Sequence, residues 1–158
     1  MGKYDKYFYK FVPQHTNWGS WCVSPQAYFR GNADLPGSNY NVGFQVFREP
    51  VYLEREPHFH REEEYLVFLG ISRPDVFDFD AEIEVWIGED IDNMERHIIT
   101  KPTIVRIPKG MWHCPVDFKK VNKPVFFQAA LMHGDFGNLK RRYRENGEAY
   151  YEYYGDGS

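Results

Sequence analysis

Two histidines separated by one residue are the first side chains in this sequence that could do chemistry together. They are His58 and His60, in the segment Pro57-His58-Phe59-His60. On an extended strand, residues two positions apart point to the same face, so the two imidazoles converge. On a helix they would lie about 200° apart, and the preceding proline disfavours a helix interior. The spacing therefore predicts a strand that presents two nitrogen ligands to one pocket.

An acidic side chain follows soon after these histidines. Glu64 lies an even number of positions from both of them and opens a predicted strand. It returns to the same face if the intervening turn preserves the alternation of side chains. Glu62 and Glu63 are the alternatives for this position. Strand alternation favours Glu64 as the anionic ligand.

A third imidazole comes from a later segment, Pro108-Lys109-Gly110-Met111-Trp112-His113. Its Pro-x-Gly sequence predicts a tight turn that delivers His113 to the start of the next extended stretch. A single histidine near aromatic residues is usually a satisfied surface or core residue. Three imidazoles and a carboxylate in this arrangement favour metal binding instead, because buried groups of this kind need partners and a cation supplies one.

These residues form a recognisable pair of motifs. The pattern H-x-H-x-x-x-E followed by Gly70, with P-x-G-x-x-H later in the chain, resembles the two motifs of the cupin superfamily. The resemblance covers roughly Val42 to Met132. It implies an all-β fold, the double-stranded β-helix of a cupin or jelly-roll barrel, with one divalent transition metal (Fe, Mn, Zn, Ni, Co or Cu). The implied metal ligands are His58, His60, Glu64 and His113.

The rest of the chain also favours β-structure. Aromatic residues make up 18% of the sequence, and Tyr and Phe prefer half-buried strands. Short strand signals alternate with Pro, Gly, Asp and Asn, without intervening amphipathic helices, which is typical of a sandwich or barrel. The predicted strands run from Val42 to Phe47, Val51 to Glu54, Glu64 to Ile71, Ala81 to Ile87, Arg96 to Thr100, Thr103 to Ile107 and Pro124 to Met132.

A length of 158 residues suits one domain. We expect an irregular N-terminal arm over residues 1–41, a barrel over 42–135 and a tyrosine-rich C-terminal tail over 136–158. Packing of the arm on the barrel is expected through Trp18, Trp21, Tyr28 and Phe29. The arm and tail, with the habit of cupin barrels to pair, imply a homodimer.

Charge and cysteine content narrow the partners. A net charge of −4 implies no general attraction to nucleic acid or anionic membranes, and we expect neither as a partner. Cys22 and Cys114 form no CxxC pattern, which argues against a disulfide framework and for a reducing compartment. No run approaches the roughly 18 apolar residues that span a bilayer, so a cytoplasmic protein is expected. On a regular strand, Cys114 would face away from the metal beside its neighbour His113.

The donor set allows chemistry on a small molecule. A cation held by four side chains keeps positions for water and for a ligand with two oxygens, which permits Lewis-acid chemistry or oxygen activation. We expect a metalloenzyme, dioxygenase-, isomerase- or decarboxylase-like, acting on a small oxygen-bearing organic molecule. The alternative is a cupin module that binds a small molecule or a metal without turnover. The sequence does not decide between them, and it indicates no general base.

Overall fold

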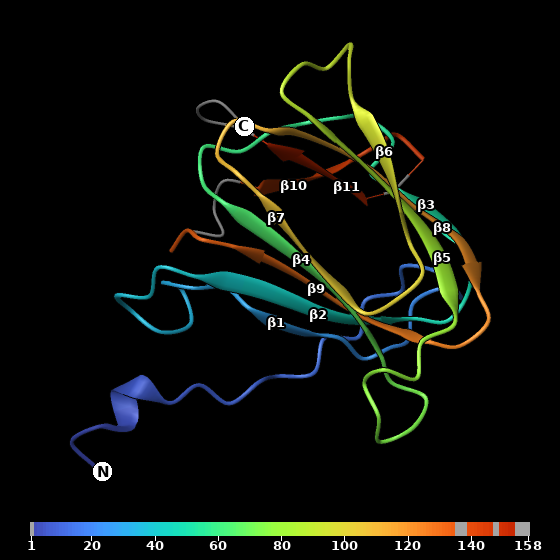
Figure 1. Ribbon diagram of the computed structural model, residues 1–158. Helices are drawn as coiled ribbons and strands as arrows, with labels where there is room; N and C mark the ends of the chain where they lie inside the picture. Colours follow the sequence, from blue (N-terminus) through green and yellow to red (C-terminus); the bar gives the residue numbers. More distant parts are fainter. Residues whose placement is uncertain (1, 135–138, 147–148, 154–158) are drawn as a thin grey trace.

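The computed structural model describes residues 2–134, 139–146 and 149–153 (Figure 1). One 3-10 turn, η1 (Asp5–Tyr7), precedes a chain built from strands. The strands are β1 (Ala27–Phe29), β2 (Asn41–Phe47), β3 (Val51–Leu53), β4 (Glu64–Gly70), β5 (Ala81–Gly88), β6 (Glu95–Ile99), β7 (Thr103–Ile107), β8 (Trp112–Val121), β9 (Val125–Leu131), β10 (Leu139–Tyr143) and β11 (Ala149–Tyr153).

These strands form two antiparallel sheets that face each other, and a separate hairpin. The first sheet has the order β1-β2-β9-β4-β7, the second has the order β3-β8-β5-β6, and β10 pairs with β11. The chain repeatedly crosses from one sheet to the other, as Figure 1 shows for β2, β3 and β4. This arrangement confirms the predicted all-β jelly-roll barrel.

Each predicted strand range overlaps an observed strand, but the longest strand is missing from the prediction. β8 is a central strand, between β3 and β5, and it contains Pro115. A proline normally argues against a central strand because it cannot donate a ladder hydrogen bond. Here Pro115 lies where the register of β8 shifts against β5, between the pairs Val85↔Val116 and Ile87↔His113. The extra residue in β8 is a β-bulge, which tolerates the proline.

Phenylalanine rings fill the space between the sheets. Phe47, Phe68 and Phe118 are fully buried, and Phe127 is 6% exposed. Phe47 lies 4.6 Å from Phe118 and 5.3 Å from Phe127, ring centroid to ring centroid. Phe68 lies four residues after Glu64 of the first motif, and Phe118 lies five residues after His113 of the second motif. At about 3.3 Å per strand residue, the aromatic core is therefore about 13–17 Å along the strands from these polar groups.

The N-terminal arm has two parts. Its second part lies on the barrel: β1 pairs with β2, the Trp21 ring packs edge-on against Phe47 at 5.2 Å, and Trp18 Nε1 donates a hydrogen bond to the Tyr28 hydroxyl. The first part leaves the barrel, as the dark blue segment of Figure 1 shows. In the described part of the chain, no helix is long and apolar enough to cross a membrane.

Candidate metal centre

Two strands from opposite sheets bring the predicted ligands to one end of the barrel. Glu64 is the first residue of β4, where it pairs with Ile107 of β7 and Leu131 of β9. His113 is the second residue of β8. The segment between β3 and β4 crosses the gap between the sheets and carries His58 and His60. The candidate centre thus lies between the two sheets.

The histidine segment is extended, but it is not a regular strand. His58 forms an isolated antiparallel bridge with His113. The His58 N–H donates a hydrogen bond to the His113 carbonyl at 3.0 Å, and the His113 N–H donates one to the His58 carbonyl at 2.9 Å. Two residues later, the His60 carbonyl accepts a hydrogen bond of 2.8 Å from the Gly110 N–H. Backbone contacts with the second motif therefore orient both histidines.

The predicted Pro-x-Gly turn is present before β8. The Met111 N–H donates to the Pro108 carbonyl at 3.1 Å, and Gly110 has a φ of 75°. Glycine adopts this left-handed conformation without the steric cost that a Cβ would add. The turn fixes where β8 starts and so where His113 stands.

The side chains of both motifs meet in one cluster. His60 Nε2 donates a hydrogen bond to Glu64 Oε2 at 3.0 Å, and His113 Nε2 lies 3.7 Å from Glu64 Oε1. The candidate ligand atoms of His60, Glu64 and His113 all lie within 4.8 Å of one another. The ring of His58 is 4.4 Å from that of His113 and 4.9 Å from that of His60, between centroids.

The two alternative glutamates face other partners. Arg106 donates hydrogen bonds to the Glu63 carboxylate from its Nε, at 2.8 Å, and from a terminal guanidinium nitrogen. The Tyr65 hydroxyl also donates a hydrogen bond to Glu63, at 3.1 Å. Glu62 Oε1 lies 3.7 Å from His133 Nε2. Of the three consecutive glutamates, Glu64 is therefore the one that the turn brings to the histidines.

Cys114 does not face away from the cluster, so the expectation for it was wrong. Its Sγ lies within 4.8 Å of the nitrogen donors of both His58 and His113. Cys114 has a φ of 80° and lies in the β-bulge of β8, which breaks the alternation of side chains. His113 and Cys114, although consecutive, are both buried and face the interior.

Burial sets the protonation of the cluster. Desolvation, reinforced by His113 and His60, lowers the pKa of His58 to about 3. Desolvation also lowers the pKa of His113. Burial by itself would raise the pKa of Glu64, but the hydrogen bond from His60 and the field of the histidines hold it below its usual range. At neutral pH, His58 and His113 are neutral and Glu64 is ionised, the protonation states in which these groups bind metals.

One atom of the cluster has an unsatisfied hydrogen-bonding capacity. His113 is fully buried, and its Nδ1 lies 2.9 Å from the Met111 carbonyl, which can only accept, so Nδ1 carries the proton. Its Nε2 then presents a lone pair to the cluster, and it is the one buried side-chain nitrogen or oxygen without a hydrogen-bond partner among the described residues. A lone pair buried beside a carboxylate is a position that a cation would satisfy. The residues present therefore fit a divalent metal.

Comparison with solved structures supports this architecture. Peruvianin-I, a cysteine peptidase from Thevetia peruviana latex, superposes with a TM-score of 0.58 and 12% identity over 87% of this chain and 78% of that chain. Oxalate oxidase in complex with the substrate analogue glycolate gives 0.53 and 14%, over 84% and 62% respectively. Vicilin from Corylus avellana, the hazelnut, gives 0.54 and 12%, over 92% and 36%. The chain has a cupin fold.

The cupin assignment rests on structure and not on sequence similarity. No protein-family model matches this sequence, and no curated protein matches it. The similar structures include both enzymes and the vicilin, so the fold does not by itself fix an activity. What this chain does has to be argued from its site.

Glu54 is a site residue that the sequence did not indicate. It follows β3, has a φ of 50° and is exposed over the residue as a whole. Desolvation of its carboxyl group, followed by repulsion from Glu64, nevertheless raises its pKa. Glu54 therefore lies at the edge of the cluster, where its carboxyl interacts with Glu64 and His60. Neither motif contains it, and no spacing argument would have found it.

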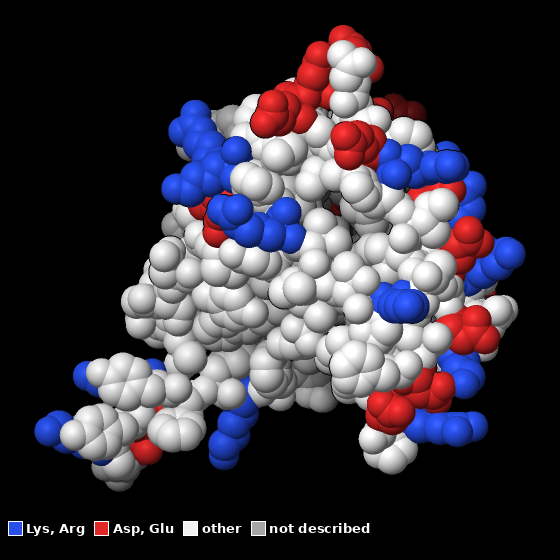
Figure 2. Space-filling view, in the orientation of Figure 1, with Lys and Arg blue, Asp and Glu red and all other residues white. Residues whose placement is uncertain are grey.

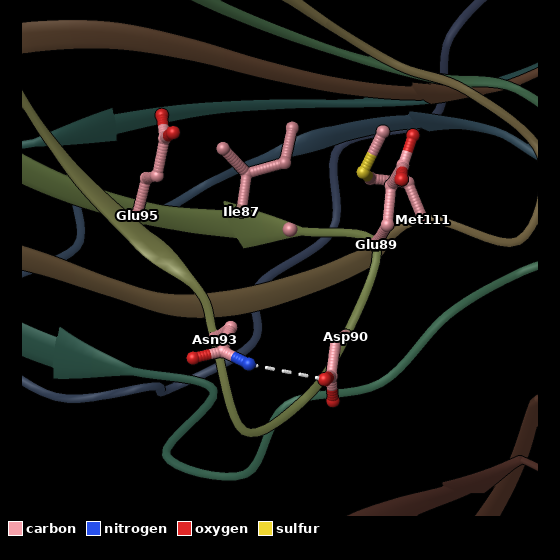
Figure 3. Close-up of a pocket in the computed structure, with 7 residues that line it drawn as sticks. Ile87, Glu89, Asp90, Asn93, Glu95 and Met111 are labelled. Carbon is pink, nitrogen blue, oxygen red and sulfur yellow. Dashed lines mark hydrogen bonds between the residues drawn. The ribbon is translucent and has the colours of Figure 1, made fainter.

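An open surface pocket of about 440 Å³ is lined by sequence and strand neighbours of His113, although no member of the cluster lines it. Its apolar wall includes Ile87, which pairs with His113 across the two strands, and Met111, whose carbonyl faces His113 Nδ1. Its polar wall belongs to the loop between β5 and β6, where Figure 3 shows Asn93 bound to Asp90. Acidic side chains gather over this end of the molecule in Figure 2. The full lining is Ile87, Gly88, Glu89, Asp90, Asn93, Glu95 and Met111.

Proposed function

We propose that this cupin binds one divalent transition metal through His58, His60, Glu64 and His113. The observation that carries the proposal is the buried, unpartnered Nε2 of His113, which faces the ionised carboxylate of Glu64. Three imidazoles and one carboxylate suit Fe, Mn, Co, Ni, Zn or Cu. One similar structure, a Bacillus subtilis oxalate decarboxylase, is described with Mn(II) centres. That description supports the proposal that this chain binds a divalent transition metal.

We further propose that the bound metal serves catalysis on a small oxygen-bearing organic molecule, in a dioxygenase-, isomerase- or decarboxylase-like reaction. A divalent metal here would supply Lewis-acid chemistry or oxygen activation. In this chain, the Met111 carbonyl accepts a hydrogen bond from His113 Nδ1 and so directs Nε2 to the cluster, and the hydrogen bond from His60 helps to keep the Glu64 carboxylate ionised. We place the approach of the ligand at the surface pocket beside Ile87 and Met111, because Ile87 pairs with His113 across the two strands.

Elemental analysis tests the metal site. Protein purified without a histidine tag and incubated with Mn, Fe, Co, Ni, Cu or Zn is expected to retain about one equivalent of metal after gel filtration. His113→Ala is expected to lose it, and His15→Ala, which alters an exposed histidine outside the cluster, is expected to keep it. Absence of bound metal from both wild type and His113→Ala would end the proposal.

Turnover separates the enzyme from a binding module without catalysis, which is the second candidate. The similar oxalate oxidase, solved with the substrate analogue glycolate, makes small carboxylic acids the first substrates to test, followed by diketones, catechols and sugar derivatives. Oxygen uptake or substrate consumption by Fe- or Mn-loaded protein, lost in His113→Ala, supports the enzyme. Tight binding of such a molecule without consumption supports the module.

We also propose that two copies of the chain pair through the arm. Tyr7 and Phe8 are 66% and 77% exposed, on a segment that points away from its own barrel. The arm continues into Phe11, which packs on Phe44 of β2 at 5.7 Å, and Phe44 stacks on Phe126 of β9. Figure 2 shows a mostly uncharged barrel face above the projecting arm, whereas the arm itself carries charged side chains. Exposed aromatics beside an apolar face are typical of an interface, and a second copy supplies both surfaces.

Sedimentation checks the pairing. The wild type is expected to sediment as a dimer at micromolar concentration, and a chain lacking residues 2–8 as a monomer. A monomeric wild type would contradict the proposal.

A further inference from the structure

Two groups of donor side chains in this protein share one residue, His113. His60, Glu64 and His113 form one group, and His58, His113 and Cys114 form the other. In each group, all the donor atoms lie within 4.8 Å of one another. Because Nδ1 of His113 is held by the Met111 carbonyl, the atom of His113 that is available to a cation in both groups is Nε2. A cation held between His58 and His113 would have Cys114 Sγ as a near neighbour.

The position of Cys114 comes from the backbone and not from a chance rotation of its side chain. A regular β8 would turn Cys114 to the opposite face from His113. The bulge between Val116 and His113, with the φ of 80° at Cys114, places both side chains toward the interior. Cys114 is 4% exposed and His113 is not exposed at all. Solvent therefore offers few hydrogen bonds to either side chain.

The charges around the thiol indicate what it would gain from a cation. The thiol is buried, and the carboxylates of Glu54 and Glu64 are close enough to interact with it electrostatically. A divalent cation reverses this local balance, because a thiol that coordinates a metal loses its proton. Glu64 and Cys114 would each hold the cation together with His113, which belongs to both donor groups.

We propose that Cys114 Sγ is an additional ligand of the metal bound by the histidine cluster, which makes the donor set nitrogen, oxygen and sulfur. This inference rests on the metal site proposed above. On binding, the S–H bond breaks, a sulfur–metal bond forms and the proton passes to the solvent, with no change of oxidation state. A thiolate favours softer ions such as Co(II) and Zn(II) over Mn(II). The chain is thereby distinguished from a cupin with only nitrogen and oxygen ligands.

Cobalt spectroscopy tests the sulfur ligand directly. Co(II)-loaded wild type is expected to show a near-ultraviolet charge-transfer band from sulfur to cobalt. Cys114→Ala is expected to bind cobalt without this band. Cys22→Ala is the matched control, because Cys22 is also buried but belongs to neither donor group, and it is expected to keep the band. Cobalt stoichiometry is measured on the same samples.

The outcomes separate this inference from the metal site itself. Wild type that binds cobalt without the band, or Cys114→Ala that retains the band, overturns the sulfur ligand and leaves the histidine site intact. Wild type that binds no cobalt, zinc or other divalent metal overturns both. If Cys114→Ala does not fold, X-ray absorption of the zinc-loaded wild type replaces it, with a sulfur neighbour expected at about 2.3 Å. A zinc shell of nitrogen and oxygen alone overturns the inference.

Discussion

Mild acid is expected to destabilise the chelator-treated protein through His58. The pKa of this imidazole is about 3 in the folded protein, against 6.5 without perturbation. The unfolded chain binds the proton below pH 6.5 and the folded chain does not until about pH 3, so stability falls as the pH falls through this interval. One pKa unit corresponds to about 1.4 kcal/mol, so the loss from His58 between pH 6.5 and pH 5 is about 2 kcal/mol.

Urea unfolding at pH 7, 6 and 5 in the presence of a chelator measures this loss. Glu64 stays ionised at pH 5, the lowest pH of the series, because its pKa lies below the usual range of a glutamate. In His58→Phe the dependence of the unfolding free energy on pH is expected to be shallower by up to one proton. Some dependence remains, because the pKa of His113 is also lowered. Equal pH dependence in wild type and His58→Phe would refute the reasoning, as would a stability that is constant from pH 6.5 to pH 5.

Three further predictions separate residues of the candidate site from residues that stabilise the barrel. Glu64→Gln is expected to weaken metal binding by more than about 100-fold, because loss of a residue that only hydrogen-bonds to a ligand already lowers metal affinity by about 10- to 100-fold. Glu63→Gln is expected to leave metal affinity unchanged. Calorimetric titration with Zn(II) compares the two variants. Phe47→Ala is expected to lower the free energy of unfolding by about 3–5 kcal/mol in urea, because it opens a cavity beside Phe118. Gly31→Ala is expected to lower the thermal unfolding midpoint, because Gly31 has a φ of 61° and a Cβ there would lie 2.6 Å from the Gly134 carbonyl oxygen. An unchanged midpoint would contradict that account.

Much of the fold could be predicted because it depends on local patterns. Alternating apolar residues and turn residues indicated the strands, and the predicted bounds Thr103 to Ile107 agree with those of β7. For β8 the sequence indicated only an extended stretch that starts near His113, and its full length was not predicted. Pro115 lies inside it, and a central strand tolerates a proline only where a bulge accommodates it. Bulges depend on the register with a neighbouring strand, which one sequence segment does not contain.

The sequence by itself determined the donor types at the candidate site. The spacing of His58 and His60, and the turn before His113, make these imidazoles converge wherever the two motifs meet, because alternation and turn geometry are local properties. That they bind a metal stays a prediction. The choice of Glu64 over its neighbours followed from the same alternation, and the structure places it beside His60 and His113.

Only the tertiary structure decided which other groups share this space. Glu54 comes from the end of β3 and meets Glu64 because the chain crosses between the sheets there. Cys114 was expected to face away, and a shift of one residue between β8 and β5 turned it toward His58. Side-chain direction within one strand follows from the sequence, whereas a bulge and a crossing depend on how separate strands pair. The convergence of the histidines and Glu64 was therefore accessible to sequence reasoning, and the position of Cys114 was not.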